Sequence, residues 1–406
     1  MSKTTSLKTT CCIAGGGPAG MMLGYLLTRS GVEVIVLEKH DDFFRDFRGD
    51  TIHPSTLELM HELDLLDTFL QQPHQQLSKL SVIINGQTIP AIDFSHLPTK
   101  AKFIAMMPQW DFLNFIATQA SKLPHFDLHK STEVTDLIEE DGTVKGVIAK
   151  TPQGQLRVLA DLVIAADGRS STVRALSNLK VINTGAPIDV LWFRLNKPQS
   201  AIQGALGRIK DSNFMITIDR GSYYQTALII QKNGFEVIKA KGIAAFRQLI
   251  TFIEPNFEEV ITDIKSWDQV KLLNVQINHL EKWYKPGLLC IGDAAHAMSP
   301  MGGVGINLAI QDAVATANIL AEKLSNQCCS IQDLAKVQAR RTWPTKMTQR
   351  LQVMAQRRFF SNAKSNQALS VSKPVAFILK ILAPLLRRVL ARVVGIGFRA
   401  EHIHKK

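Results

Sequence analysis

The stretch "TTCCIAGGGPAGMMLGYLLTRSGVEVIVLEK" near the N-terminus places the strongest limit on how this chain folds. An apolar, β-branched run leads into Gly15, Gly17 and Gly20, and an apolar run with helical spacing follows. A second apolar strand, "VEVIVLE", closes the unit. Strand, glycine turn, helix and strand in this order predict a βαβ unit, and therefore an α/β fold with a Rossmann-type domain.

The three glycines match the pattern Gly-x-Gly-x-x-Gly, in which each glycine has a physical task. Gly15 permits the tight turn, Gly17 lets the backbone approach a pyrophosphate, and Gly20 lets the helix pack closely on the strand. The helix N-terminus, where Pro18 and Ala19 lie, offers free N–H groups and a positive dipole end to phosphates. The pattern predicts a dinucleotide site.

The acid that such a site requires is present. Glu38 ends the second strand, 18 residues after Gly20, and Lys39 follows it. A carboxylate there accepts hydrogen bonds from a ribose diol, whereas a 2′-phosphate would require a nearby arginine. Glu38 and Lys39 are therefore expected at an NAD or FAD site. The alternative is a glycine-rich turn that binds nothing.

Two further acid–glycine pairs end other apolar strands. "LRVLADLVIAADGRSSTVR" ends its strand at Asp167 and Gly168, and "GLLCIGD" ends at Gly292 and Asp293. The second pair continues into "AAHAMSPMGGVGINLAIQDA", which combines a proline, three closely spaced glycines, an asparagine and a helical run. A strand, an acid, a glycine turn and a helix are typical of a backbone that approaches a polar ligand closely.

In order and spacing, the three motifs resemble those of the class A flavoprotein monooxygenases, the para-hydroxybenzoate hydroxylase type, over roughly residues 9–325. The resemblance implies a GxGxxG-fold FAD-binding domain in which Glu38 holds the adenosine ribose and Arg48 lies near the pyrophosphate. It implies that Gln109 contacts the flavin. Asp167 and Gly168 would lie near both FAD and the nicotinamide cofactor.

The resemblance also places the later glycine turn at the flavin. Asp293 would bond the ribityl chain. A helix N-terminus beside the flavin would stabilise the negative charge of its reduced form. Five further residues would lie along the isoalloxazine ring: Pro300, Gly302, Gly303, Gly305 and Asn307.

The activity implied is that of a monooxygenase. NAD(P)H would reduce FAD, oxygen would form a flavin C4a-hydroperoxide, and one oxygen atom would enter an electron-rich, aromatic and lipophilic small molecule. Two alternatives remain open. One is an FAD-dependent reductase or dehydrogenase of a polyprenyl or quinone-type lipid, similar to the geranylgeranyl reductases. The other is a nucleotide-binding scaffold without activity.

Catalytic side chains do not follow from the motifs. His296, in "AAHAMSP", could relay protons beside a flavin, but a hydrogen-bonded structural histidine is favoured. Trp192, Phe193, Tyr223 and Tyr224 are aromatic candidates for the substrate pocket, with core packing as an equal alternative. Tyr223 and Tyr224 are also candidate catalytic residues, because a tyrosine could help to deprotonate a phenol substrate. Five cysteines without a CxxC pair predict neither a disulfide framework nor a metal site, and they favour a reducing cytoplasm.

The order of the motifs predicts two interleaved domains and a C-terminal region. The FAD-binding domain is expected over 1–75, 101–180 and 276–325, and an inserted antiparallel sheet over 76–100 and 181–275. The sheet is read from strand-like runs such as "LSVIINGQTIPAIDF", "DVLWFRLN", "NFMITIDR" and "SYYQTALIIQ", and "GIAAFRQLITFIEPNF" predicts a helix beside them. Residues 326–406 form a basic helical region.

That C-terminal region accounts for the net charge of +12, because its last 73 residues carry 16 Lys and Arg but one acid, Glu401. Pro384 should kink or interrupt its last helix. Five basic residues share one arc of that helix, opposite an aliphatic face: Lys380, Arg387, Arg388, Arg392 and Arg399.

The favoured interpretation of this region is that the aliphatic face closes the core of the enzyme. Peripheral contact with the inner face of a membrane is the alternative. No motif for nucleic acid accompanies the charge. The chain shows neither a signal peptide nor an apolar run long enough to span a membrane, so a cytoplasmic monomer or homodimer is expected.

Overall fold

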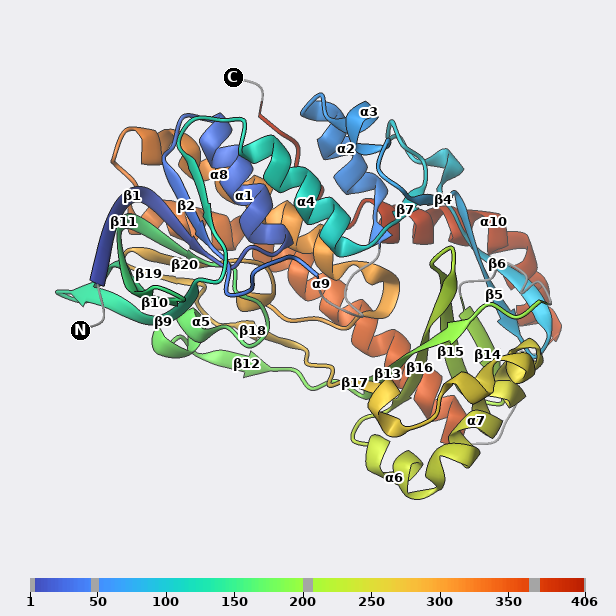
Figure 1. The fold of residues 1–406 in the computed structure, drawn as a ribbon. Helices are drawn as coiled ribbons and strands as arrows, with labels where there is room; N and C mark the ends of the chain where they lie inside the picture. Colours follow the sequence, from blue (N-terminus) through green and yellow to red (C-terminus); the bar gives the residue numbers. More distant parts are fainter. Residues whose placement is uncertain (1–3, 45–50, 200–206, 365–372, 405–406) are drawn as a thin grey trace.

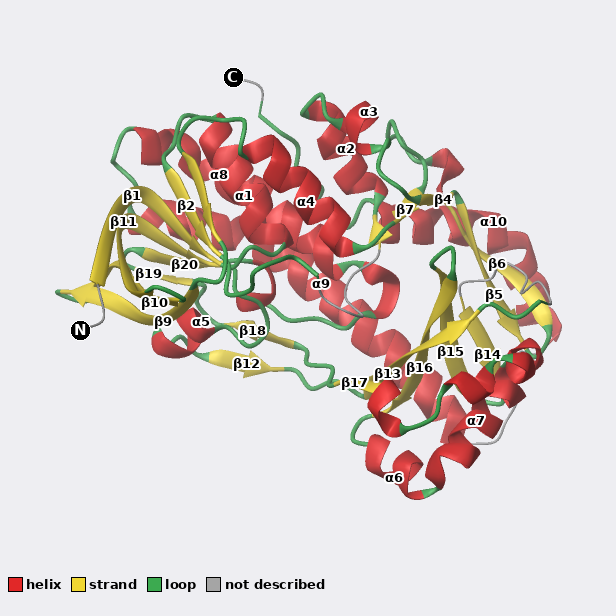
Figure 2. Cartoon of the chain, viewed as in Figure 1, coloured by secondary structure: helices red, strands yellow, loops and turns green. Residues whose placement is uncertain are grey.

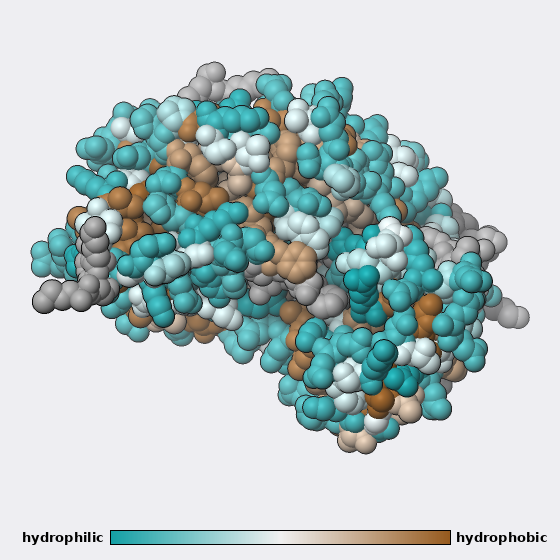
Figure 3. Space-filling view, in the orientation of Figure 1, coloured by the Kyte–Doolittle hydropathy of each residue, from teal (hydrophilic) through white to brown (hydrophobic). Residues whose placement is uncertain are grey.

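The computed structural model describes residues 4–44, 51–199, 207–364 and 373–404, and for 359–364 and 373–382 only the backbone. Two lobes make up the molecule (Figure 1): an α/β lobe with the N-terminus, and a lobe built on a second sheet. The face drawn in Figure 3 is largely hydrophilic. The α/β fold class expected from the sequence is confirmed, together with the inserted sheet.

The α/β lobe is centred on an eight-stranded sheet. β1 (Thr4–Ala14) lies between β2 (Val34–Leu37) and β11 (Gly154–Ala165), and β8 (Phe126–His129) and β20 (Leu288–Cys290) extend the parallel set on either side. The chain moves from β1 to β2 and β8, then crosses to β11 and β20. Parallel sheets bind ligands at the carboxyl ends of their strands where the order reverses, which here is beside β1.

Helices pack on the parallel strands. α1 (Pro18–Arg29) packs against α4 (Gln109–Ala120) and α8 (Gly305–Ser325). Cys11 and Cys12 are fully buried, and burial raises the pKa of the Cys12 thiol to about 12. The thiols of β1 therefore act as small core side chains, as expected from the sequence.

The second lobe contains a seven-stranded sheet that includes all the strands predicted for it. Every pair of neighbours runs antiparallel except β14 and β5, which are parallel. This pair corrects the expectation of a purely antiparallel sheet: β5 comes from an earlier part of the chain and is not joined to β14 by a hairpin. In order across the sheet the strands are β17 (Lys271–Leu273), β13 (Ile188–Asn196), β16 (Tyr223–Gln231), β15 (Asn213–Asp219), β14 (Gly207–Lys210), β5 (Lys79–Ile84) and β6 (Gln87–Asp93).

The two faces of this sheet have different tasks. On β13, Leu191 and Phe193 point into a core formed with α7 (Gly242–Ile253), the helix predicted there. Val190 and Trp192 alternate with them and face a cavity. Because side chains of a strand alternate between faces, one sheet both closes a core and walls a site.

Two helices follow α8. α9 (Ile331–Lys364) runs from the α/β lobe to the second sheet (Figures 1 and 2), and α10 (Lys373–Gly395) packs against β6 and the 3-10 turn η1 (Phe94–His96). α10 continues through Pro384, so the predicted interruption is absent from this helix. Proline removes one backbone hydrogen bond, which the remaining bonds of a long packed helix can compensate.

Shorter elements complete the fold. Among the described residues, one helical segment, Met301–Ser325, is long and apolar enough to span a membrane, but 67% of its most apolar window is buried inside the protein. The shorter elements are β3 (Thr51–Ile52), α2 (Pro54–Glu62), α3 (Leu66–Phe69), β4 (Gln75–Leu77), β7 (Ile104–Met106), β9 (Glu133–Glu140), β10 (Thr143–Thr151), α5 (Thr172–Leu176), β12 (Val181–Asn183), α6 (Phe235–Ala240), η2 (Pro255–Glu259), η3 (Ile261–Asp263), η4 (Trp267–Gln269), β18 (Asn278–Leu280), β19 (Tyr284–Lys285), η5 (Gly292–Ala294) and η6 (Met301–Gly303).

Candidate active site

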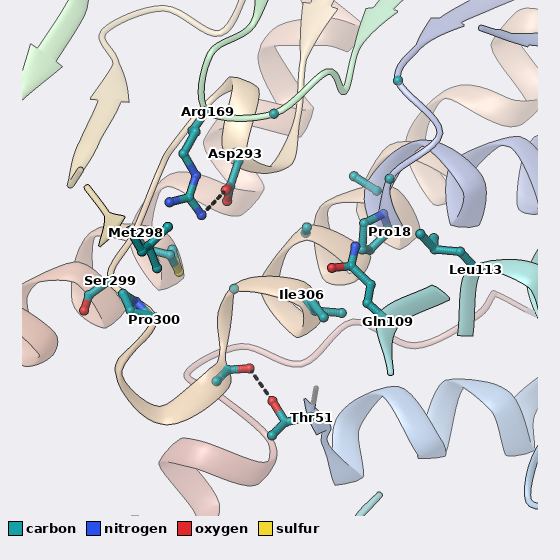
Figure 4. Close-up of a pocket in the computed structure, with 18 of the residues that line it drawn as sticks. Pro18, Thr51, Gln109, Leu113, Arg169, Asp293, Met298, Ser299, Pro300 and Ile306 are labelled. Atoms are coloured by element: carbon teal, nitrogen blue, oxygen red, sulfur yellow. Dashed lines mark hydrogen bonds and ion pairs between the residues drawn. The ribbon is translucent and has the colours of Figure 1, made fainter. Parts of the chain in front are cut away.

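A cavity of about 560 Å³ extends from the carboxyl end of β1 to the inner face of the second sheet. Most of the residues singled out in the sequence line it, although they come from segments nearly 300 positions apart. They are Gly15, Gly17, Pro18, Ala19, Glu38, Lys39, Gln109, Asp167, Gly168, Asp293, Pro300, Gly302, Gly303 and Gly305. Figure 4 shows Pro18 and Gln109 on one side of the cavity and Asp293 with Pro300 on another.

The first glycine turn is dictated by space. Gly15 has a φ of 106°, and a Cβ there would lie 2.5 Å from the carbonyl oxygen of Ala166. A Cβ on Gly20 would lie 2.0 Å from the oxygen of Gly15. Gly17, in contrast, has no atom within 4 Å of its hypothetical Cβ. Packing therefore requires Gly15 and Gly20, whereas Gly17 leaves open space at the N-terminus of α1, where a phosphate group fits.

Glu38 is held against this turn. Its carboxylate accepts hydrogen bonds from the N–H of Gly16 at 2.9 Å and from the N–H of His40 at 3.1 Å. The side chain is buried yet lines the cavity. These bonds orient the carboxylate at the end of β2, the position from which such an acid reaches a ribose.

Asp167 organises the second motif. It accepts hydrogen bonds from the Ser171 hydroxyl and from the N–H of Val173, the latter at 3.1 Å. Burial raises the pKa of Asp167, and these hydrogen bonds oppose that shift. Gly168 follows with a φ of 88° and open space at its Cβ position. Asp167 thus shapes the turn, and Gly168 brings its backbone to the cavity.

Arg169 is a site residue that the sequence analysis missed. Its Nη2 lies 3.5 Å from Oδ2 of Asp293, an ion pair drawn in Figure 4. Its Nη1 is buried and has no hydrogen-bond partner in the described parts of the chain, and the residue lines the cavity. A buried guanidinium N–H without a partner suits an oxygen-rich ligand. The sequence feature that could have identified Arg169 is its position directly after the Asp167–Gly168 pair, in "DGR".

The third motif brings backbone to the cavity. Gly302 and Gly303 have φ values of 82° and 65°, and a Cβ on Gly303 would lie 2.3 Å from Oγ1 of Thr51. The Thr51 hydroxyl donates to the carbonyl oxygen of Gly303 at 3.0 Å (Figure 4). α8 then begins at Gly305, and its first residues, with Ile306, line the cavity. A helix N-terminus therefore faces the space.

Comparison with known proteins identifies the family. A family model described as "FAD binding domain" matches residues 8–350. The chain belongs to this FAD-binding family, and it is an FAD-dependent monooxygenase. It is 31% identical over 387 residues to the 6-methylpretetramide 4-monooxygenase of Streptomyces rimosus, covering 95% of this chain and 92% of that protein.

More distant relatives agree. A rifampicin monooxygenase of Rhodococcus hoagii is 25% identical over 74% of this chain, which spans 61% of that protein. The fold matches the anhydrotetracycline hydroxylase OxyS from Streptomyces rimosus with a TM-score of 0.77 at 20% identity, over 98% of this chain and 78% of that one. These relatives do not favour the reductase alternative.

The cavity of the monooxygenase fits FAD. Open space at Gly17 beside a helix N-terminus suits the pyrophosphate, and the unpartnered Nη1 of Arg169 suits an oxygen-rich cofactor. Arg48, which the family resemblance placed near the pyrophosphate, lies outside the described residues.

Two predicted residues serve the monooxygenase from behind the cavity wall. Asn307 is buried: its Oδ1 accepts from the N–H of His53 at 2.9 Å and the hydroxyl of Thr56 at 2.8 Å, and its Nδ2 donates to the carbonyl oxygens of Thr51 at 3.1 Å and Gly303 at 3.3 Å. The hydrogen-bonding groups of the Asn307 amide are thus all paired with protein atoms, and one of these bonds positions Gly303. The expectation that Asn307 itself lies along the ring is therefore corrected.

His296 also lies in the core. It is 1% exposed, and its Nε2 lies 2.5 Å from Oδ2 of Asp312. Burial raises the pKa of Asp312, but the charges and hydrogen bonds of His296 and Arg341 outweigh it and lower the pKa overall. His296 does not line the cavity. This placement agrees with a structural histidine and not with a proton relay.

The aromatic residues proposed for the substrate pocket lie in different environments. Trp192 lines the cavity, whereas Phe193 points to the opposite face of the sheet, where its ring lies 5.4 Å from that of Phe246. Tyr224 packs toward Phe257 on that same opposite face. Tyr223, the first residue of β16, stacks with Arg194 at 4.0 Å and is not among the residues that line the cavity. The expectation that Tyr224 contacts the substrate is therefore corrected.

The half of the cavity walled by the second sheet is apolar. Every side chain that the described sheet strands contribute is aliphatic or aromatic, and none titrates. They are Leu80, Ile92, Ile188, Val190, Trp192, Phe214, Ile216, Ile218, Ala227, Ile229 and Leu273.

Proposed function

We propose that this monooxygenase hydroxylates a lipophilic, fused-ring aromatic compound, with NAD(P)H as the reductant. The observation that carries the proposal is the continuity of one cavity from the glycine turn of β1 to the apolar sheet face. Such a wall favours a large uncharged ring system over a small carboxylated phenol. The similar protein from Streptomyces rimosus is named as a 6-methylpretetramide 4-monooxygenase.

The protein's part in this reaction is binding and positioning. The glycine turn and α1 bind the pyrophosphate, Glu38 binds the adenosine ribose, and Asp293 binds the ribityl chain. When bound, FAD supplies the hydride acceptor and the oxygen-activating group. The N-terminus of α8, at Gly305, faces the cavity and would stabilise negative charge on a flavin bound there. The apolar sheet face orients the substrate and excludes water.

The test is turnover in air by protein reconstituted with FAD. NADPH or NADH is added with phenol, 1-naphthol or 9-phenanthrol, and oxygen uptake, peroxide release and product mass are measured. We expect the fused-ring compounds to accelerate NAD(P)H oxidation most. When air is replaced by isotopically labelled dioxygen, the product should contain one labelled oxygen atom. Flavin reduction without oxygen uptake would instead support the reductase alternative.

We also propose that this cytoplasmic enzyme contacts an anionic membrane surface through α10. The last turns of the helix use Ala391 and Val394 to pack on the protein. The outward face is aliphatic and is flanked by exposed Arg388 and Arg392. An exposed aliphatic face beside arginines suits the interface of an anionic bilayer. Four residues form this face: Leu385 (59% exposed), Leu386 (42%), Val389 (51%) and Leu390 (46%).

A further inference from the structure

α9 lies along the loop that carries the third motif and contacts it through three buried glutamines. Nε2 of Gln349 donates to the carbonyl oxygens of Asn278 at 2.8 Å and Ala297 at 2.9 Å. Nε2 of Gln352 donates to the carbonyl oxygens of Ser299 at 3.0 Å and Met301 at 2.8 Å. Gln349 and Gln352 lie three residues apart on one face of α9, and Gln356, four residues further on, lies on the same face.

Gln356 differs from the other two because it also lines the cavity. It is 1% exposed, and its Nε2 donates to the Ser299 hydroxyl oxygen, which also accepts the N–H of Met301 at 3.2 Å. Its Oε1 is buried without a hydrogen-bond partner among the described residues. Rotating the amide exchanges its oxygen and nitrogen, so either orientation leaves one polar atom unpaired.

The side chains around this end of α9 are apolar. Val353, one turn earlier on α9, packs in one cluster with Ile188, Val190 and Ala227, all from the cavity face of the second sheet. Gln356 thus stands where the helix meets the apolar half of the cavity. An unpaired buried carbonyl costs free energy that a ligand hydroxyl can recover.

We propose that Gln356 is a substrate-orienting residue, whose amide oxygen accepts a hydrogen bond from a ring hydroxyl of the aromatic substrate. This inference rests on the proposed function and narrows the substrate to an uncharged hydroxyarene. The anchored amide sits beside Ser299, and Pro300 follows in the cavity wall. A hydroxyl held there fixes which ring edge faces the third motif.

The experiment compares a matched pair of ligands, 9-phenanthrol and 9-methylphenanthrene. Binding to the oxidised holoenzyme is followed by the change in flavin absorbance without NAD(P)H. We expect Gln356→Leu to weaken 9-phenanthrol binding about three- to ten-fold and to leave 9-methylphenanthrene binding unchanged or stronger. In turnover, the same variant should raise KM for 9-phenanthrol and the share of NAD(P)H oxidation that ends as peroxide.

Gln349→Leu is the control, because Gln349 supports the same loop but does not line the cavity. It should change the binding of both ligands by the same factor, since a loosened loop does not distinguish a hydroxyl from a methyl group. Equal effects of Gln356→Leu on the two ligands would overturn the inference alone. Failure of the wild-type enzyme to bind either ligand would overturn the proposed substrate class and this inference together.

Discussion

Nε of Arg341 lies 2.9 Å from Oδ1 of Asp312, and neither side chain has any exposed surface. Oδ2 of Asp312 receives the N–H of Gly292 at 3.0 Å and faces His296. Nη1 of Arg341 reaches Oε1 of Glu401 at 3.2 Å. One buried network therefore joins α8, α9 and the C-terminal tail to the turn that precedes Asp293.

We expect Arg341→Met to destabilise the fold by about 3–5 kcal/mol, because it removes the one fully buried guanidinium that both Asp312 and Glu401 contact and leaves each of these buried carboxylates with one cationic partner fewer. Urea unfolding of the holoenzyme measures this. Arg340→Met is the control: Arg340 also bonds Glu401, at 2.9 Å, but it is 37% exposed. Its loss should cost about 1 kcal/mol. If both variants lost the same unfolding free energy, the argument that burial makes the Arg341 contacts stronger would be wrong.

Gly17→Ala should separate cofactor binding from folding. Gly17 has a φ of −75° and open space at its Cβ position, so alanine introduces neither strain nor a clash in the protein. The added methyl group occupies the space assigned to the pyrophosphate. We expect unchanged unfolding of the apoprotein and at least a ten-fold weaker FAD affinity, measured by flavin fluorescence. Unaltered FAD affinity would show that the pyrophosphate lies elsewhere.

His53 should make stability depend on pH. Burial lowers its pKa to about 4, although the hydrogen bond to the carbonyl oxygen of Val394, at 2.7 Å, opposes the shift. The unfolded chain binds this proton at about pH 6.5, so the contribution is complete above that pH and is lost as pH falls toward 4. The difference between the pKa values of His53 in the folded and unfolded chain corresponds to about 3 kcal/mol of unfolding free energy.

Unfolding free energies between pH 4 and pH 7 measure this effect. His53→Asn keeps an N–H donor for Val394 but does not titrate, so the variant should lose this part of the slope. If this variant retained the wild-type slope, another group would be responsible for it.

Val389→Glu on α10 should abolish binding to vesicles that contain phosphatidylglycerol, with little effect on stability, because Val389 is 51% exposed. Flotation of the full-length protein measures this. Vesicles of phosphatidylcholine alone provide the comparison for charge, and Val237→Glu, at another exposed valine, controls for the substitution. Chromatography that instead showed a dimer dissociated by Val389→Glu would assign the face to a second copy of the chain.

Much of the site was predictable because its signals are local in sequence. Gly15, Gly17 and Gly20 are required by contacts within one βαβ unit, and that unit is visible in about thirty residues. Asp167 and Asp293 each follow a strand of the same parallel sheet. The carboxyl ends of these two strands therefore lie at the same edge of the sheet, regardless of the path of the loops between them. The β-branched and aromatic residues of β13 likewise predicted a strand.

The roles of the remaining residues depended on long-range packing. Asn307 was expected along the flavin ring and Tyr224 was a candidate for the substrate pocket, yet Asn307 is bonded behind the cavity wall and Tyr224 lies on the other face of its sheet. Hydrogen-bond partners more than two hundred residues away, such as Thr51 for Asn307, leave no local trace. Outside the described residues, Arg48 stays a prediction.

The sequence by itself determined the α/β framework, the FAD fingerprint and most strands of the second sheet, although not β14 or β17, because glycine turns and apolar periodicity act over a few residues. Only the tertiary structure decided that α9 turns Gln356 into the cavity and that α10 packs through Ala391 while Val389 faces outward. A helical pattern shows which residues share a face, but the partner of that face depends on where the rest of the chain has packed.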